Sequence, residues 1–256
     1  MIWPKISVVS PSFNQGPFIE QTLQSVLGQH YPNLEYIVID GGSSDGAKEI
    51  IERYSEQLSY WVSEPDQGQT HALVKGFARA TGDILCWLNS DDLFEPDTLR
   101  QVAEYFVQHS SVQVVYGDAL WMDRTGKIVG PKKEHDFNRF VWFFDHNYIP
   151  QPSLFWRREL FLQVGGMDAS YELAMDTALI AKFLTTTTPQ HVTRTWSRIR
   201  RYPEQRNQRL REQSDREDAA LREHYCGKQT RMGLLAKRVL AKSLRVTLKL
   251  LRGCYW

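Results

Sequence analysis

Residues 84–92 are Ile-Leu-Cys-Trp-Leu-Asn-Ser-Asp-Asp, five apolar side chains followed by two small polar ones and two carboxylates. An apolar run of this length indicates a buried strand. Asp is a poor strand former and is rarely buried without a partner, so Asp91 and Asp92 at the carboxyl end of a core strand need a reason. A divalent cation supplies one, because carboxylate oxygens suit Mg²⁺ or Mn²⁺. The alternative is that Asp92 caps the helix that Glu-Pro-Asp at residues 95–97 indicates.

The rest of the first half alternates apolar runs with helical patterns. Runs at residues 6–9, 36–39 and 58–62 precede the strand at 84–88, and apolar residues at helical spacing separate them. This alternation predicts an α/β fold, with a mostly parallel sheet, right-handed crossovers and helices on both faces. The second half is less regular, and the elements expected there are strands at 112–116, 119–122 and 153–156 and helices at 157–164, 176–184 and 206–225.

A polar cluster follows each of the four strands, at residues 10–14, 40–46, 63–68 and 89–92. The carboxyl ends of parallel strands lie at one edge of the sheet, where α/β proteins bind ligands, so the clusters predict one shared site. Asp40 meets a glycine-rich turn, and its carboxylate suits a base or ribose that donates hydrogen bonds. The chain contains neither G-x-x-x-x-G-K-[ST] nor G-x-G-x-x-G, which argues against P-loop NTPases and dinucleotide-binding dehydrogenases.

A set of short segments, taken together, is far more specific than any one of them. In chain order they are Val8–Asn14 (VVSPSFN), Val38–Gly46 (VIDGGSSDG), Glu64–Gly68 (EPDQG), Ala80–Ile84 (ATGDI), Leu88–Asp92 (LNSDD), Gln151–Ser153 (QPS), Gly165–Asp168 (GGMD) and Ala174–Asp176 (AMD). In this order the chain resembles the family 2 glycosyltransferases, which have a GT-A type fold. The resemblance implies a glycosyltransferase domain at residues 1–205 and a helical C-terminal extension at residues 206–256 that ends in a basic amphipathic tail.

The resemblance also implies a nucleotide-sugar donor, with a UDP-sugar favoured because relatives commonly use one. Pro11, Ser12 and Asn14 would line the nucleoside pocket. Asp40 would contact the base or ribose, and Asp66 would lie near the ribose and the diphosphate.

The family's D-x-D motif corresponds to residues 89–91. Asp91 matches its closing Asp, whereas Asn89 replaces the opening Asp and Ser90 lies between them. An amide accepts hydrogen bonds but carries no charge. Asp91 is therefore the best candidate for a metal ligand, Asp92 is the second, and we assign Asn89 and Ser90 to the donor. We expect Mn²⁺ or Mg²⁺, which would offset the charge on the departing diphosphate.

The implied reaction is an inverting displacement at the anomeric carbon, which needs a base for the acceptor hydroxyl. The family places this base at the start of a late helix, where Asp176 stands, with Asp168 and Glu172 as runners-up. The alternative is that Asp176 only caps that helix. His71 and Val74 stand where relatives often carry Asp and Asn. The Q-x-x-R-W motif of processive synthases is absent, so we expect a single sugar addition.

Charge is distributed unevenly along the chain. From His224 to the end there are eight Lys or Arg and no Asp or Glu, which leaves the remainder with 23 basic and 30 acidic residues, a net charge of −7. In the tail, one helical face carries basic residues at 238, 242, 245, 249 and 252, and the other carries Leu at 240, 244, 248 and 251. This pattern predicts that residues 230–256 lie on an anionic membrane surface. The alternative is a helix that packs on the domain or on a partner.

Three cysteines without metal spacing favour a reducing compartment. The start of the chain lacks the apolar region of a signal peptide, and no apolar run approaches the ~20 residues that span a bilayer. We expect a cytoplasmic protein, peripheral on the inner face of the cell membrane, with no nucleic-acid partner. The expected function is transfer of a sugar to a lipid-linked glycan acceptor in surface polysaccharide synthesis, such as that of lipopolysaccharide. The alternative is a catalytically silent nucleotide-sugar-binding or membrane scaffold protein.

Overall fold

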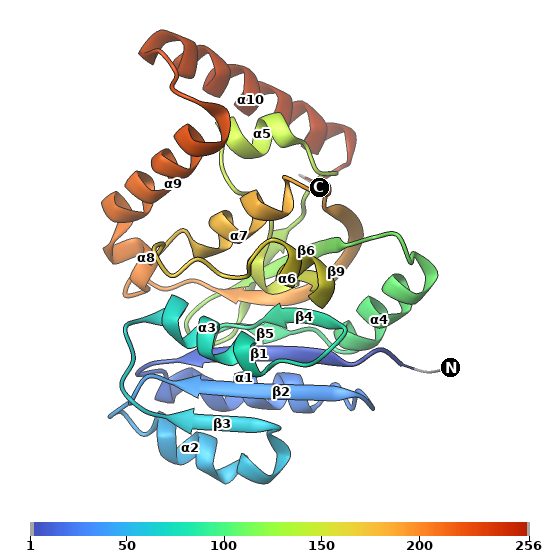
Figure 1. Cartoon of the computed structure of the whole chain (residues 1–256), viewed down its shortest axis with the longest axis vertical. Helices are drawn as coiled ribbons and strands as arrows, with labels where there is room; N and C mark the ends of the chain where they lie inside the picture. The colour runs from blue at the N-terminus through green and yellow to red at the C-terminus, as the bar shows by residue number, and fades with distance from the viewer. Residues whose placement is uncertain (1–2, 255–256) are drawn as a thin grey trace.

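A computed structural model describes residues 3–254. In that part of the chain nine strands form one sheet, with helices on both of its faces (Figure 1). The strands are β1 Ile6–Ser12, β2 Leu34–Asp40, β3 Tyr60–Ser63, β4 Ile84–Trp87, β5 Leu93–Phe94, β6 Val114–Met122, β7 Ile128–Lys132, β8 Leu154–Arg157 and β9 Gln190–Arg200. The helices are α1 Gly16–Leu27, α2 Ala47–Arg53, α3 Gln69–Arg79, α4 Thr98–Gln108, α5 Arg139–Phe144, α6 Arg158–Gln163, α7 Met175–Phe183, α8 Arg206–Arg209, α9 Arg211–Cys226 and α10 Arg231–Leu251, with 3₁₀ turns η1 Ser55–Gln57 and η2 Gln151–Ser153.

The strand order is β3-β2-β1-β4-β8-β6-β9-β5, with β7 paired to β6. The first four strands pair with one another in parallel, as the alternation of the sequence predicts. β8 is antiparallel to both β4 and β6, so the second half of the sheet is mixed. The α/β class is confirmed, and the loops after β1, β2, β3 and β4 share one edge.

Two apolar cores lie on opposite faces of the sheet. Along β4, Leu85 and Trp87 pack into one core with α3, α5 and α7, whereas Ile84 and Cys86 pack into the other with α1 and α4. A strand that is covered on both faces has no polar face. This explains why residues 84–88 are apolar throughout.

The strands of the second half differ from the sequence-based expectation, which did not include β7. The strands predicted at 112–116 and 119–122 form one strand, β6. β9, the longest strand with 11 residues, was not predicted, because its sequence QHVTRTWSRIR is mostly polar. β9 pairs with β6 and β5, and its C-terminal end lies next to the loop after β4.

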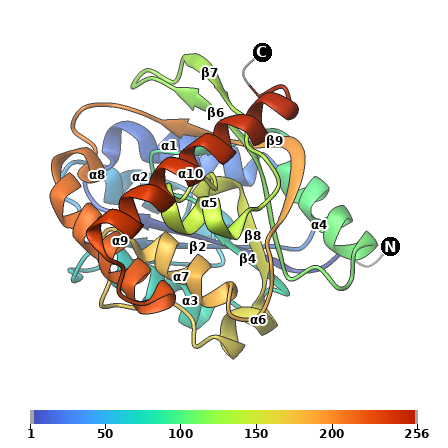
Figure 2. The same ribbon diagram turned by 90° about the horizontal axis from the view of Figure 1, so that it is seen from above.

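The C-terminal helices pack on the domain. α10 crosses over α5, and α9 lies beside α7 (Figures 1 and 2). Ala241 is fully buried in the core, and Leu244 and Leu248 pack against the same core. Leu240 and Leu251, predicted to lie on the same apolar face, are instead 61% and 80% exposed. The division of the chain at residue 205 stays a prediction.

The predicted basic face of the tail is split between the body and the solvent. Three of its residues pair with carboxylates of the body, in the pairs Arg245–Asp145, Lys249–Glu134 and Arg252–Asp136. These three side chains are therefore engaged by the domain, and membrane binding of the tail stays a prediction. Arg238 and Lys242 are exposed. Residues 255–256 of the tail lie outside the described residues.

Between residues 3 and 254 no helix has both the length and the apolar character that crossing a membrane requires.

Candidate active site

The loop after β2 is organised by Asp40, whose side chain is fully buried. Its carboxylate accepts hydrogen bonds from Ser43 N at 2.9 Å, Ser43 Oγ at 2.5 Å and Ser63 Oγ at 2.7 Å. Gly42 N donates to the same group at 3.2 Å, and its φ of +82° favours glycine. Asp40 therefore shapes the glycine-rich turn from within, and any contact with a base or ribose would use the lone pairs that are left.

The loop after β1 lies against this turn. Asn14 has a left-handed φ of +51°; its N–H donates to Ser43 Oγ at 2.8 Å, and its Oδ1 accepts from Ser44 N at 3.0 Å. Pro11 and Ser12 are buried at the end of β1. The hydroxyl oxygen of Ser12 is buried without a hydrogen-bond partner among the described residues. An unsatisfied buried hydroxyl is rare, which makes Ser12 the clearest candidate for a ligand contact in this loop.

Phe13, between Ser12 and Asn14, is a residue that sequence reasoning missed. Its ring is 60% exposed at the rim of the sheet. A large aromatic side chain in that position offers a flat surface for a nucleobase. The signal for it was present in the sequence, since an aromatic residue inside a polar cluster is unusual.

The loop after β3 meets the glycine-rich turn through Asp66. Asp66 Oδ1 accepts from Gly68 N at 2.8 Å, and Gly68 has a φ of +109°. A side chain at Gly41 would approach Asp66 Oδ2 to 3.0 Å, so the two loops are in close contact. His71 accepts a hydrogen bond at Nδ1 from Gln67 N at 3.1 Å and so helps to shape this loop.

The loop after β4 holds Asp91, and its partners come from the segment after β9. Asp91 Oδ2 accepts hydrogen bonds from Tyr202 Oη at 3.0 Å and from Gln205 Nε2 at 3.2 Å. The buried side chain of Arg200 donates from Nε to the Asp91 carbonyl at 2.8 Å. Burial raises the pKa of Asp91. Sequence reasoning missed Tyr202 and Gln205, because the residues around them give no sign of a contact with a residue over 100 positions away.

The side chains of Asp92 and Asn89 form hydrogen bonds with other residues of the protein. Asp92 is buried, with Oδ1 accepting from Arg200 N at 2.9 Å and Oδ2 from Asn89 Nδ2 at 3.3 Å. Burial, and then the neighbouring Asp91, raises the pKa of Asp92. Asn89 also bonds Gln69 and Gln151, at 2.8 and 3.2 Å. An amide suits this position because it donates to the Asp92 carboxylate, which a second carboxylate would repel.

The metal fit differs between the two carboxylates. Both side-chain donors to Asp91 use Oδ2, whereas Asp92 has partners on both oxygens. The described residues contain no group of three or more His, Cys, Asp or Glu that could hold an ion. Mg²⁺ is often bound by one or two carboxylates plus substrate phosphates. Asp91 fits such a shared site, while Ser90 is buried beside it.

Asp176 lies in the first turn of α7. Its Oδ1 accepts from Thr177 N at 2.8 Å and its Oδ2 from Asn147 Nδ2 at 3.1 Å. Burial raises the pKa of Asp176. The residue that precedes the helix is Ala174, so Asp176 is not its N-cap. Glu217 of α9 accepts hydrogen bonds from the N–H groups of residues 172, 173 and 174, and so satisfies the start of α7 from a distant helix.

The two runners-up for the base have other roles. Asp168 accepts from Ser170 N at 3.0 Å and Ser170 Oγ at 2.6 Å, and these bonds lower its pKa. Glu172 pairs with Arg206. Arg206 follows Gln205, the partner of Asp91. A series of contacts therefore joins the Asp91 loop to the start of α7.

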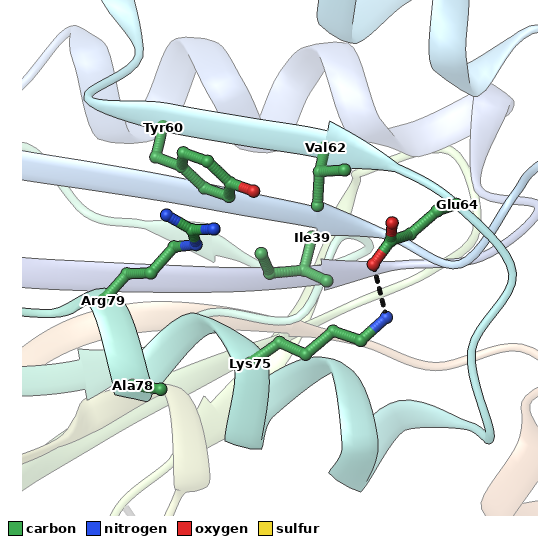
Figure 3. Close-up of a pocket in the computed structure, with 7 residues that line it drawn as sticks. All are labelled: Ile39, Tyr60, Val62, Glu64, Lys75, Ala78 and Arg79. Carbon is green, nitrogen blue, oxygen red and sulfur yellow. Dashed lines mark hydrogen bonds and ion pairs between the residues drawn. The ribbon is translucent and has the colours of Figure 1, made fainter.

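Two hollows accompany the site. The first, of about 470 Å³, lies between β3 and α3 at the free edge of the sheet (Figure 3). Its charged groups are engaged with neighbours, since Glu64 and Lys75 are 2.7 Å apart and the Arg79 guanidinium lies 3.8 Å from the centre of the Tyr60 ring. None of the predicted site residues lines it.

The second hollow has a volume of about 660 Å³ and is lined by α5, α7, α9 and α10. Asn147 and Thr177, which both bond the Asp176 carboxylate, line it. Asp218 of α9 lines it too, and burial followed by repulsion from Asp176 raises the pKa of Asp218 to about 6. Sequence reasoning predicted a helix at residues 206–225 but assigned it no functional residue, and so missed Asp218.

Solved structures share this fold. S. aureus TarS 1–349 in complex with UDP-GlcNAc matches with a TM-score of 0.65 and 19% identity, over 78% of this chain and 60% of that one. The mannosyltransferase PcManGT of Pyrobaculum calidifontis, in complex with GDP-Man and Mn²⁺, matches with a TM-score of 0.65 and 21% identity, over 94% of this chain and 70% of that one. The fold and the loops after β1, β2, β3 and β4 together define a GT-A type α/β protein.

Sequence comparisons identify the family. Residues 7–165 match the glycosyl transferase family 2 profile. An uncharacterized glycosyltransferase of Mycobacterium tuberculosis (strain H37Rv) is 32% identical over 181 residues, which are 70% of this chain and 68% of that protein. A PGL/p-HBAD biosynthesis glycosyltransferase of the same strain is 30% identical over 180 residues, 69% of this chain and 68% of that protein. The chain belongs to glycosyl transferase family 2 and is a glycosyltransferase.

Proposed function

We propose that the chain moves a sugar from a nucleotide-sugar donor to a hydroxyl group of a lipid-linked glycan acceptor, with inversion at the anomeric carbon. The observation that carries this proposal is the half-buried carboxylate of Asp176, whose pKa is raised by burial, at the start of α7. A general base works best when its pKa is closer to the working pH than that of an ordinary carboxyl group. Asp168 and Glu172 are engaged elsewhere, which favours Asp176.

The donor would bind at the edge formed by the loops after β1 to β4. Ser12, with its unpartnered hydroxyl, and the exposed ring of Phe13 are suited to the nucleoside. Pro11 and Asn14 would shape the pocket, and Asp40 and Asp66 would hold the two loops that border the ribose and the diphosphate. TarS was solved with UDP-GlcNAc and PcManGT with GDP-Man. A UDP-sugar stays our preferred donor, with GDP as the competing base.

The residue proposed to hold a divalent cation is Asp91, through the carboxylate that Tyr202 and Gln205 orient. When bound, Mn²⁺ or Mg²⁺ would neutralise charge on the diphosphate. Asp92 would hold the loop that carries Asp91 in place, through its hydrogen bonds with the Arg200 N–H and with Asn89. Ser90 would support the same loop.

The proposed chemistry needs few groups of this chain. As the acceptor oxygen forms its bond to the anomeric carbon, Asp176 would take the hydroxyl proton. The bond between that carbon and the diphosphate oxygen would break on the opposite face, and the nucleoside diphosphate would leave with the bonding electrons. Asn147 and Thr177 would keep the Asp176 carboxylate in place.

The lipid-linked acceptor and the peripheral location are supported by the outer side of α10. Five apolar residues, which we call the outer stripe, are 37–83% exposed there: Met232, Leu235, Val239, Val246 and Leu250. Arg231, Arg238 and Lys242 flank the stripe, since residues three and four apart share a side of a helix. An apolar face beside basic residues is suited to an anionic leaflet. We propose that the protein works on the inner face of the cell membrane in surface glycan synthesis.

A transfer assay tests the proposal. Purified protein is given UDP-sugars or GDP-Man, with and without Mn²⁺, and nucleoside diphosphate release is followed for the wild type, D176N and D168N. We expect Mn²⁺-dependent release that is lowered at least about 100-fold in D176N and retained in D168N. A silent binding or scaffold protein, the competing function, would bind donor without releasing the diphosphate under any condition. That result would remove the enzymatic proposal.

A further inference from the structure

The hollow beneath α10 has the size and lining of a binding site. Its volume of about 660 Å³ falls within the range of roughly 300–1,000 Å³ that small-ligand sites occupy. Aromatic side chains of α5 form one wall, and charged residues of α9 and α10 form the other. In Figures 1 and 2, α10 passes over α5, and α9 and α7 lie to the side, so residues far apart in sequence meet here.

Five basic residues of α10 and its C-cap form two groups that differ in their partners. Each of Arg245, Lys249 and Arg252 has a carboxylate of the body as its ion-pair partner. Arg238 and Lys242, which line the hollow, make no hydrogen bond or ion pair with any residue between 3 and 254. Arg245, Lys249 and Arg252 therefore hold the helix on the domain. Arg238 and Lys242 are left to line the hollow.

Arg222 of α9 lines the same hollow as Arg238 and Lys242. Its Nε donates to the carbonyl of Phe143 at 2.6 Å. Burial, and next the positive charge of Arg238, lowers the pKa of Arg222, and this effect of Arg238 exceeds the opposing effect of Asp218. Two guanidinium groups that repel each other beside a hollow are stabilised when an anion enters between them.

The carboxylates of the hollow do not cancel this charge. Asp145 is engaged by Arg245. Asp218, with a pKa raised to about 6, has one buried oxygen without a partner among the described residues. Asp215 is exposed at the rim. Arg222, Arg238 and Lys242 thus share the hollow with Asp215 and Asp218, so the three cations outnumber the two carboxylates that have no ion-pair partner within residues 3–254.

We infer that this hollow is an acceptor subsite that binds a phosphate or diphosphate group through Arg222, Arg238 and Lys242, while the acceptor hydroxyl reaches Asp176. The inference rests on the proposed function and names the chemistry of its acceptor. Asn147 and Thr177 connect the hollow to the Asp176 carboxylate at 3.1 and 2.8 Å. Trp142 and Phe144 offer an apolar wall to the rest of the acceptor. Val239 belongs both to the hollow and to the outer stripe, so a lipid chain has a short route outward.

The test uses the full chain with farnesyl phosphate, farnesol and inorganic phosphate as probes, and follows binding by calorimetry. The variant is R238A/K242A, and the matched control is K228A/R211A, which removes two exposed basic residues outside the hollow and outside the outer stripe. We expect farnesyl phosphate to bind about tenfold more weakly to R238A/K242A, since two charge-assisted contacts are lost. The control variant should stay within about twofold of the wild type.

The probes separate the sources of the anion. Tighter binding of farnesyl phosphate than of both farnesol and inorganic phosphate supports a lipid-borne phosphate. Inorganic phosphate that binds as tightly as farnesyl phosphate, and is lost in R238A/K242A, supports the subsite and assigns it to a free phosphate. Equal binding of farnesol and farnesyl phosphate, or equal binding to the wild type and R238A/K242A, overturns the inference.

A separate measurement keeps this test independent of the proposed function. UDP and Mn²⁺ are titrated into the same proteins. If UDP binds the wild type while farnesyl phosphate does not, this inference fails alone. If the transfer assay shows no donor turnover but farnesyl phosphate binds through Arg238 and Lys242, the subsite stands and the enzymatic proposal fails.

Discussion

Tyr202 donates its hydroxyl hydrogen bond to Asp91 Oδ2 at 3.0 Å, across 111 positions of sequence. Tyr202 follows β9, and Asp91 follows β4. The path of β9 therefore places the Tyr202 hydroxyl next to the carboxylate of Asp91, the residue that matches the closing Asp of the D-x-D motif. Gln205 adds a second donor to the same oxygen at 3.2 Å. The other oxygen of Asp91 carries neither of these bonds, so it is the oxygen that would hold the proposed cation.

Replacing Tyr202 by Phe tests this orientation. Removing a partner that orients a metal ligand commonly lowers metal affinity or activity by about 10- to 100-fold. We expect Y202F to need more Mn²⁺ for half-maximal donor turnover, while Gln205 preserves part of the effect. Y31F is the matched control, because the Tyr31 hydroxyl bonds the Pro4 carbonyl outside the site. An unchanged Mn²⁺ titration of Y202F would separate Tyr202 from the metal.

The pH profile of turnover reports on Asp176. Burial raises the pKa of this carboxyl, and a base must be deprotonated to act. Activity should therefore rise with pH and level off above the range of an ordinary Asp, which titrates near ~3.9. D176N should lose about 10²- to 10⁴-fold in kcat over the whole range. A D176N protein that keeps the wild-type profile would exclude Asp176 as the base.

Stability should fall as pH rises through the range of Asp218. The pKa of Asp218 in the folded chain is about 6, above its ordinary value of 3.8, so the folded state binds more protons between these values. Stability from this group is complete below about pH 4 and is lost by about pH 6, by at most about 3 kcal/mol. Thermal unfolding of D218N should lack this loss. D215N, an exposed neighbour, should behave as the wild type; a D218N curve parallel to the wild type would contradict the assignment.

Restoring the family's opening Asp at position 89 should harm the protein. N89D places a second carboxylate against Asp92 and removes the donor that Asn89 gives it at 3.3 Å. We expect N89D to unfold with about 1–3 kcal/mol less stability than the wild type. N89A removes the same donor without adding charge, so the difference between the two variants isolates the repulsion. Equal or greater stability of N89D in thermal unfolding would refute this explanation of Asn89.

Vesicle binding tests the outer stripe of α10. L235E/V239E adds two carboxylates to the stripe and should lower binding to anionic vesicles at least about tenfold, because both apolar burial and charge attraction are lost. V107E/L162E makes the same change at exposed apolar residues of α4 and α6 and should bind normally. Co-sedimentation gives the bound fraction. If L235E/V239E sediments with the vesicles as the wild type does, α10 does not bind the membrane through this stripe.

Local patterns predicted the first half of the fold well. Each of β1, β2, β3 and β4 is an apolar run followed by polar residues, and both features are visible in a few consecutive positions. The edge that they form was predicted for the same reason. β9 was missed, because pairing with β6 and β5 stabilises a strand whose own residues are mostly polar. When neighbouring strands stabilise a strand, its own sequence need not show an apolar pattern.

The sequence by itself determined the parallel half of the sheet, the edge where Asp40, Asp66 and Asp91 lie, and the family, since apolar continuity and motif order are properties of consecutive residues. Only the tertiary structure decided which groups act together. Asp91 meets Tyr202, and Asp92 meets Asn89 and the backbone of Arg200. The basic residues of the tail also differ in their partners, because, within residues 3–254, carboxylates of the body pair with Arg245, Lys249 and Arg252 but not with Arg238 and Lys242. Such choices depend on charge and distance between segments that the chain brings together only when it folds.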